Sequence, residues 1–215
     1  MRANMIYLYE HHAGFDDTTV GFPSISGCHA ILLQADNGLY GYHSLGGVSA
    51  DSAKRRAVGF AQFFRNHAIG ATPQVLWGAC FLHSRGYGSA GKQGWKAEIS
   101  EYATAVGLGA NDVRGFDIGS GIPEIKVNGT TQTLSAYVEF RLTKGKITID
   151  YKRWSKMKDS STAALTPGAG DYFKIHPTKG TLDNPDKAMK PCEIIVTKSN
   201  KGQIHDASSR GMFTA

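Results

Sequence analysis

The chain has 215 residues, of which 41% are hydrophobic and 20% are charged, and its formal net charge is +6. This composition is typical of a soluble globular protein, and the length suffices to bury a substantial core. No apolar run approaches the roughly 20 residues that span a bilayer, which excludes a helical membrane protein.

The first expected elements are short. The sequence predicts a strand over residues 4–10 and a loop over residues 11–17, which begins with two histidines. Residues 18–22 are expected to be extended, and Pro23 should either end this segment or place it at a sheet edge. His11 and His12 have no acidic or histidine partner at helical spacing, so we expect a surface loop there and no metal site. No cofactor is expected.

A β-hairpin follows over residues 20–47 and organises the chain. A Ser-Gly-Cys turn leads into an apolar strand that begins at Cys28, and a tight Asp-Asn-Gly turn connects it to a second strand that ends at His43. Two strands joined by so short a turn pair antiparallel. Pairing brings Cys28, at the start of the first strand, close to His43 at the end of the second.

Helices alternate with strands after the hairpin. Residues 50–67 predict a helix capped by Ser49 or Asp51, with an apolar face at Ala53, Ala57, Phe60, Ala61 and Phe64. Lys54, Arg55 and Arg56 are expected mainly on its other side. A buried strand (73–83), a Gly-rich mobile loop (84–94), a second helix (94–107) and a strand (113–118) come next. Two hairpins follow, at 124–133 and at 134–151.

The order of elements predicts an α+β fold: a layered β-sandwich-like mixed sheet core with two main helices on one side. The composition changes at Ser155, where the chain becomes polar and rich in proline. We therefore expect one main domain over residues 1–154. Residues 155–215 are expected to form a partly irregular C-terminal extension, with short strands such as 172–175 and 193–197.

Cysteine usage and charge limit the environment and the partners. Cys28, Cys80 and Cys192 lie far apart, without a Cys-x-x-Cys pair, which argues against a disulfide scaffold and a structural zinc site. The basic excess lacks zinc-finger spacing or an RNA-binding aromatic motif, so nucleic acid is not the expected partner. The N-terminal segment has no signal-peptide apolar region. We expect a monomer that is cytoplasmic in the producing cell.

A thiol beside an imidazole is the minimal device for nucleophilic catalysis. The imidazole removes the thiol proton and later gives it to the leaving group. Gly27 lets a substrate approach closely, and N–H groups of the turn can stabilise an oxyanion. Ser26, Ser24 and a backbone carbonyl of the 4–10 strand are three candidates to orient the imidazole. Cys80 and Cys192 have no comparable glycine entry and paired histidine.

These residues carry a resemblance to a known group of enzymes. Ser26-Gly27-Cys28, with His43 on the strand Gly38-Leu-Tyr-Gly-Tyr-His43, resembles the catalytic core of the glutamine deamidases of the cytotoxic necrotising factor type. It is also similar to the chemotaxis receptor deamidases, in which a Gly-Ser-Cys turn leads an apolar strand. The similarity in the order of elements extends over roughly residues 18–151, so the resemblance implies that residues 1–154 form a catalytic deamidase-like domain.

The resemblance implies a toxin or effector that converts a glutamine side chain of a target protein to glutamate. Cys28 would be the nucleophile, His43 the general acid and base, and Ser26 a further catalytic residue, with Gly27 and Ser24 contacting substrate. Delivery into a host cell would then need a route without a classical signal peptide. Some relatives also transfer the acyl group to amines.

The sequence departs from the group in one place and leaves alternatives open. The chemotaxis enzymes have a threonine several residues before the cysteine, where this chain has Gly21-Phe22-Pro23. One alternative is another cysteine hydrolase, such as a peptidase, an amidase or a transglutaminase. The other is a non-enzymatic protein-binding module in which Cys28 only fills the core; it predicts a buried thiol with no histidine within reach.

Overall fold

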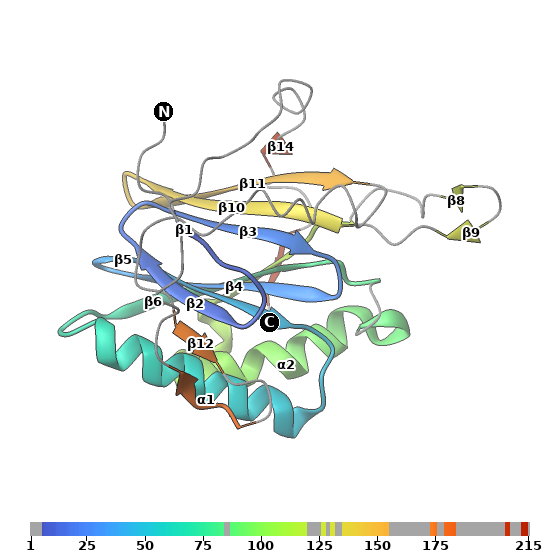
Figure 1. Ribbon diagram of the computed structural model, residues 1–215. Coiled ribbons are helices and arrows are strands. Elements are labelled where there is room, and N and C mark those ends of the chain that lie inside the picture. Colours follow the sequence, from blue (N-terminus) through green and yellow to red (C-terminus); the bar gives the residue numbers. More distant parts are fainter. Residues whose placement is uncertain are drawn as a thin grey trace.

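The protein is an α+β sandwich of three layers, as the sequence predicts (Figure 1). The computed structural model describes residues 6–83, 87–119, 126–127, 130–131, 135–154, 173–175, 179–183, 205–206 and 212–214. Two helices cover one face of a mixed eight-stranded sheet, and a five-stranded sheet covers its other face. Neither of the long helices in the described part of the chain could cross a membrane.

The eight-stranded sheet has the order β13-β12-β2-β5-β4-β6-β7-β15. Its strands are β2 (His12–Asp16), β4 (Cys28–Ala35), β5 (Gly38–Leu45), β6 (Pro73–Cys80), β7 (Val113–Asp117), β12 (Phe173–Ile175), β13 (Leu182–Asp183) and β15 (Met212–Thr214). Only β6 and β7 pair parallel; the other neighbours are antiparallel. The central strand β4 is buried along its whole length, because layers cover both of its faces.

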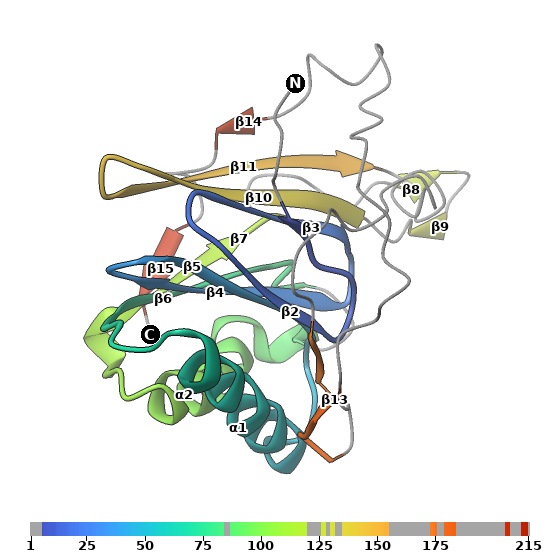
Figure 2. The same ribbon diagram turned by 60° about the vertical axis from the view of Figure 1, so that its left-hand side comes forward.

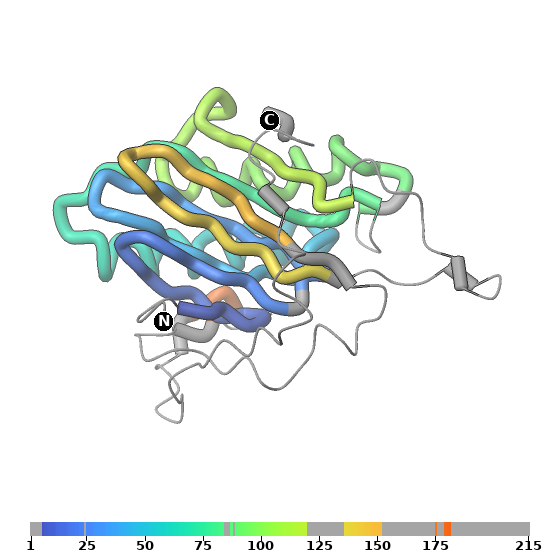
Figure 3. Tube along the Cα trace, turned by 90° about the horizontal axis from the view of Figure 1, so that it is seen from above, coloured from blue at the N-terminus to red at the C-terminus, as the bar shows by residue number. Residues whose placement is uncertain are grey.

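The five-stranded sheet has the order β1-β3-β10-β11-β14. Its strands are β1 (Ile6–Tyr7), β3 (Thr19–Ile25), β10 (Ser135–Thr143), β11 (Lys146–Trp154) and β14 (His205–Asp206). Seen from above, its strands run in much the same direction as those below them (Figure 3). The turn of the β10–β11 hairpin has positive φ at Lys144 and Gly145, as a type I′ hairpin turn requires. A separate small hairpin pairs β8 (Lys126–Val127) with β9 (Thr130–Thr131).

The helix layer consists of α1 (Ala50–His67) and α2 (Gly91–Ala105), with the short 3-10 helices η1 (Gly88–Ala90) and η2 (Ala110–Asp112). The Ser49 hydroxyl accepts a hydrogen bond from the Ser52 N–H, which confirms Ser49 as the cap of α1. The predicted apolar face of α1 is buried throughout. Arg56, expected with the exposed basic residues, is only 4% exposed, so that expectation is wrong.

Three further expectations need correction. Residues 12–16, predicted within a loop, form β2, because Ala13 to Asp16 pair with the outer edge of β5. β3 continues through Pro23, and its register against β10 shifts between Ala136 and Val138. A bulge there accommodates a residue that has no N–H to donate. β6 ends at Cys80, earlier than the predicted 83.

The described parts of the C-terminal extension lie against the main body. β12 pairs with β2, and β15 pairs with β7, so these segments form the outer strands of the large sheet (Figure 2). Ile175 is fully buried in the core under the helices. The expected strand at 193–197 lies outside the described residues.

An apolar core fills each of the two spaces between neighbouring layers. Successive side chains of β4 point to opposite faces, so Ile31 and Leu33 belong to the core between the sheet and the helices. Cys28, Ala30 and Leu32 belong to the core between the two sheets. Cys28 and His29, adjacent in sequence, therefore face different layers.

Candidate functional site

The hairpin places Cys28 and His43 on one face of the large sheet. Cys28 pairs with Leu45, and Ala30 pairs with His43, so the two side chains are diagonal neighbours across two antiparallel strands. Diagonal neighbours have Cα atoms about 7–8 Å apart, which long side chains can bridge. The sequence prediction that the turn brings this pair together is consistent with the register.

His43 is buried and has a defined tautomer. Its Nδ1 lies 2.7 Å from the carbonyl oxygen of Leu8, so Nδ1 carries the proton and donates it to that carbonyl. Its Nε2 is buried and has no hydrogen-bond partner among the described residues. Burial lowers the pKa of His43 to about 4, so the ring is neutral near pH 7.

Of the three orienting groups left open by the sequence, the carbonyl from the 4–10 segment is the one in contact with the ring. The Ser26 hydroxyl instead accepts a hydrogen bond of 2.7 Å from the Gly27 N–H and closes the turn before Cys28. The side chain of Ser24 lies outside the described part of the structure. A methyl group built on Gly27 would meet nothing within 4 Å, so the space beside the turn is open.

Cys28 is 6% exposed and lies under the side chain of Glu10. Its Sγ is 3.7 Å from Oε2 of Glu10, whose Oε1 is 3.3 Å from Nε2 of His11. Burial and then the negative charge of Glu10 raise the pKa of the thiol to about 12. No hydrogen bond joins Sγ to the imidazole of His43 within the described residues. The pair is therefore a protonated thiol and a neutral imidazole in this state.

Among the described residues, neither Cys80 nor the pair His11 and His12 forms a second site of this kind. Cys80 is fully buried, and Cys192 lies outside the described residues. His11 has a left-handed backbone conformation, with φ of 68°, in the turn before β2. Within the described part of the chain, no three histidine, cysteine or acidic side chains cluster as metal ligands would.

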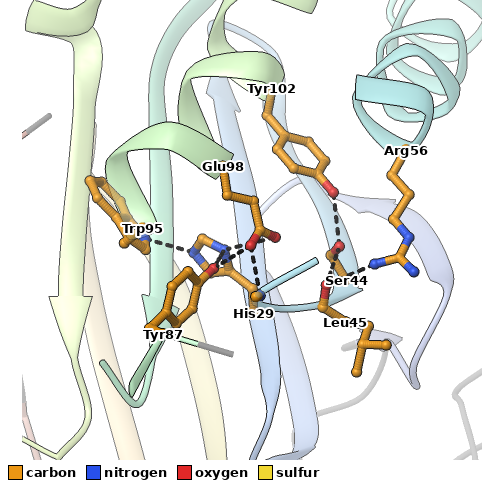
Figure 4. A network of polar contacts seen from close by, with 9 residues as sticks. His29, Ser44, Leu45, Arg56, Tyr87, Trp95, Glu98 and Tyr102 are labelled. Carbon is orange, nitrogen blue, oxygen red and sulfur yellow. Dashed lines mark hydrogen bonds and ion pairs between the residues drawn. The ribbon is translucent and has the colours of Figure 1, made fainter. Parts of the chain in front are cut away.

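A buried polar network that the sequence did not predict lies on the opposite face of the hairpin, between the sheet and the helices (Figure 4). The Trp95 indole N–H donates to Nε2 of His29 at 3.0 Å. Nδ1 of His29 lies 3.3 Å from the Tyr87 hydroxyl, which is 2.7 Å from Oε2 of Glu98. The backbone N–H of Gly47 also donates to that oxygen, at 2.8 Å.

The donors of this network point in one direction. An indole N–H can only donate, so Nε2 of His29 must accept and the proton of the ring lies on Nδ1. The Tyr87 hydroxyl accepts a hydrogen bond from that Nδ1 and donates one to Oε2 of Glu98. Burial and the neighbouring charges, including that of Glu98, raise the pKa of Tyr87 well above its ordinary value, so it stays a donor.

A second branch of the network ties the end of β5 to α1 and α2. The Ser44 hydroxyl lies 2.8 Å from that of Tyr102, and the guanidinium of Arg56 donates to the Leu45 carbonyl at 2.8 Å (Figure 4). A cavity of about 190 Å³ adjoins the network between the first turns of the two helices, and Tyr87 and Glu98 line it.

Helical spacing could have revealed two members of the network. Glu98 lies three residues after Trp95 and one before Ile99, within the apolar face of α2, and Arg56 is flanked by Ala53 and Ala57 in the same way. A charged residue within an apolar face is either paired or functional. No protein-family model matches the chain, and no curated protein is significantly similar to it in sequence.

Proposed function

We propose that this protein is a cysteine-dependent hydrolase that deamidates a glutamine side chain of a target protein, with Cys28 as nucleophile and His43 as general base and acid. One observation carries the proposal. Leu8 holds the His43 proton on Nδ1, which leaves Nε2 with a lone pair and no hydrogen-bond partner among the described residues, on the sheet face that Cys28 shares. A fixed tautomer with a free nitrogen is what a general base for a thiol needs.

The reaction would proceed through a thioester. Nε2 of His43 takes the thiol proton as Sγ of Cys28 attacks the carboxamide carbon. The C–N bond then breaks, and ammonia leaves with the proton from Nε2. Water, deprotonated by the same nitrogen, attacks the thioester, returns the thiol and leaves a glutamate. The open space beside Gly27 is where the glutamine side chain would approach.

Glu10 would control access to the thiol. Its carboxylate lies over Sγ, and its charge disfavours the thiolate. A bound target that displaced this carboxylate would both uncover Cys28 and lower the pKa of its thiol. Ser26 would act through the turn, since its hydroxyl accepts from the Gly27 N–H. The proposed role as a toxin or effector rests on the resemblance of the Ser-Gly-Cys turn to that of the glutamine deamidases of the cytotoxic necrotising factor type.

Peptide mass spectrometry tests the proposal. A library of glutamine-containing peptides and unfolded proteins is incubated with the wild type, Cys28→Ala, His43→Ala and the matched control Cys80→Ala. We expect the mass change of NH2 replaced by OH at glutamine, with release of ammonia, in the wild type and Cys80→Ala alone. Cleavage of peptide bonds would instead indicate a peptidase, and conversion that survives Cys28→Ala would exclude the mechanism.

A second candidate function is a protein-binding module without catalysis. The observation in its favour is that the buried thiol of Cys28 contacts Glu10 and makes no hydrogen bond to His43. The two candidates differ in the expected behaviour of Glu10→Gln. An enzyme should gain thiol reactivity and glutamine conversion together, whereas a binding module should gain reactivity alone.

A further inference from the structure

The cavity between the helices is formed largely by very small residues. Five of them are glycine or alanine: Gly47, Ala50, Ala53, Gly94 and Ala97. Gly47, Ala50 and Ala97 are exposed, so the cavity opens to solvent. Its volume of about 190 Å³ exceeds the roughly 150 Å³ of an engineered protein cavity that binds benzene. A ligand group of several heavy atoms therefore fits.

Glu98, one of the residues that line this cavity, has one buried carboxylate oxygen without a donor among the described residues. Its side chain is 3% exposed. Oε2 accepts from Gly47 and Tyr87, whereas Oε1 has no hydrogen bond among the described residues. Nδ1 of His29 lies 4.0 Å from Oε1, and its proton is directed to Tyr87. Buried carboxylate oxygens are normally paired, so this atom calls for a donor.

No cation of the described structure pairs with this carboxylate. Arg56 donates to the carbonyl of Leu45 and forms no ion pair with Glu98. His29 accepts at Nε2 from Trp95, so its ring carries a single proton and is neutral. A buried carboxylate without a paired cation favours a positively charged donor from outside.

We propose that this cavity binds the primary ammonium group of an alkylamine, with Oε1 of Glu98 as its acceptor. The single open acceptor atom suits an ammonium better than a guanidinium, whose five N–H groups all need partners. The glycine and alanine lining suits the alkyl chain. The amine is either a small free molecule or the lysine side chain of a bound protein.

The site is close to the Ser26–Gly27 turn but separate from the thiol. The N–H of Gly46 donates to the Gly27 carbonyl at 2.9 Å, and a methyl group built on Gly46 would lie 3.3 Å from the Tyr87 ring. Cys28 faces the opposite layer. Amine binding therefore does not depend on the proposed deamidation, and a binding measurement tests it alone.

The experiment titrates the full chain with n-butylamine and with Nα-acetyl-lysine amide, and follows the Gly47 and Gly94 amide signals by NMR. We expect saturable shifts in the wild type. The affinity derived from them should fall at least tenfold in Glu98→Gln and stay unchanged in Glu101→Gln, a matched change on the same helix. Ala97→Phe blocks the exposed mouth of the cavity and should also abolish binding, which covers a failure of Glu98→Gln to fold. n-Butanol, of the same shape without charge, should not bind.

The two amines separate the sources. Tighter binding of the lysine derivative assigns the cavity to a protein side chain, and equal or tighter binding of n-butylamine assigns it to a free amine. The proposal is overturned if neither amine gives saturable shifts, or if Glu98→Gln binds as well as the wild type. It is also overturned if inorganic phosphate binds instead, as an anion site at the start of the two helices would require.

Discussion

Nδ1 of His43 lies 2.7 Å from the carbonyl oxygen of Leu8, and this contact joins the hairpin of the large sheet to the segment that follows β1. The N–H of His11 donates in turn to the His43 carbonyl, also at 2.7 Å. The segment that orients the imidazole thus carries Glu10, whose carboxylate covers Cys28. The same few residues hold the base and cover the nucleophile.

The first prediction concerns acid stability. Burial lowers the pKa of His43 from 6.5 to about 4, so the unfolded chain binds more protons than the native state between those values. This contribution to the free energy of unfolding is present above pH 6.5 and is lost as pH falls toward 4, by about 3 kcal/mol in all. Urea titrations at pH 4.5 and pH 7 measure it.

The matched variant for this prediction is His43→Asn, which cannot titrate. Protonation of other groups also lowers the free energy of unfolding in acid. The informative quantity is therefore the difference in this loss between the wild type and His43→Asn. The wild type should lose more stability than His43→Asn between pH 7 and pH 4.5. Equal losses would mean that His43 is solvated or protonated in the native state.

The second prediction concerns the reactivity of Cys28. A thiol whose pKa is raised to about 12 should react slowly with iodoacetamide at pH 8, and the rate should show no plateau below pH 10. Glu10→Gln removes the charge that opposes the thiolate and should increase the rate several-fold. Peptide mass spectrometry follows Cys28 and the fully buried Cys80 in one sample.

Two controls test whether the effect of Glu10→Gln on the labelling of Cys28 is local. Glu101→Gln makes the same chemical change on α2 and should leave the labelling rate of Cys28 unchanged. Cys80 reports global opening, so a parallel increase in its labelling would mean that Glu10→Gln loosens the fold. A rate for Cys28 that does not respond to Glu10→Gln would contradict the role given to that carboxylate.

The hairpin and the helices could be predicted because their signals are local. A two-residue turn fixes which residues of β4 and β5 face each other, and the periodicity of α1 identifies its buried face. The layered α+β arrangement follows from the order of these elements. The pairing of β2 with β5 was missed, because a strand of five residues that begins with histidine resembles a loop.

The contacts of the polar network could not be predicted, because they join residues that are far apart in the sequence. His29 meets Trp95 across 66 residues and Tyr87 across 58. Its presence on the helix side follows only from the alternation of side chains along β4. Likewise, the orienting carbonyl of Leu8 has no side-chain signal, so residue type could not select it from the candidates.

The third prediction concerns the donor of Trp95. Trp95→Phe removes the N–H that satisfies Nε2 of His29, and an unpaired buried acceptor costs about 1–3 kcal/mol. Trp77→Phe is the matched change, since its indole N–H makes a longer contact of 3.4 Å to Gln34 in a half-buried position. Urea unfolding should show the larger loss for Trp95→Phe. A loss no greater than that of Trp77→Phe would mean that water replaces the donor.

The last prediction concerns Gly78 of β6, which makes room for the ring of His29. A methyl group built there would lie 2.3 Å from Nε2 of His29 and 3.1 Å from Nε1 of Trp95. Gly78→Ala must therefore push two buried rings apart, which should lower the free energy of unfolding by about 1–3 kcal/mol. Gly27→Ala, whose new methyl group meets nothing within 4 Å, should change stability by less than about 0.5 kcal/mol. Equal stabilities of the two variants would show that His29 and Trp95 can separate without cost, and that their hydrogen bond does not hold the network together.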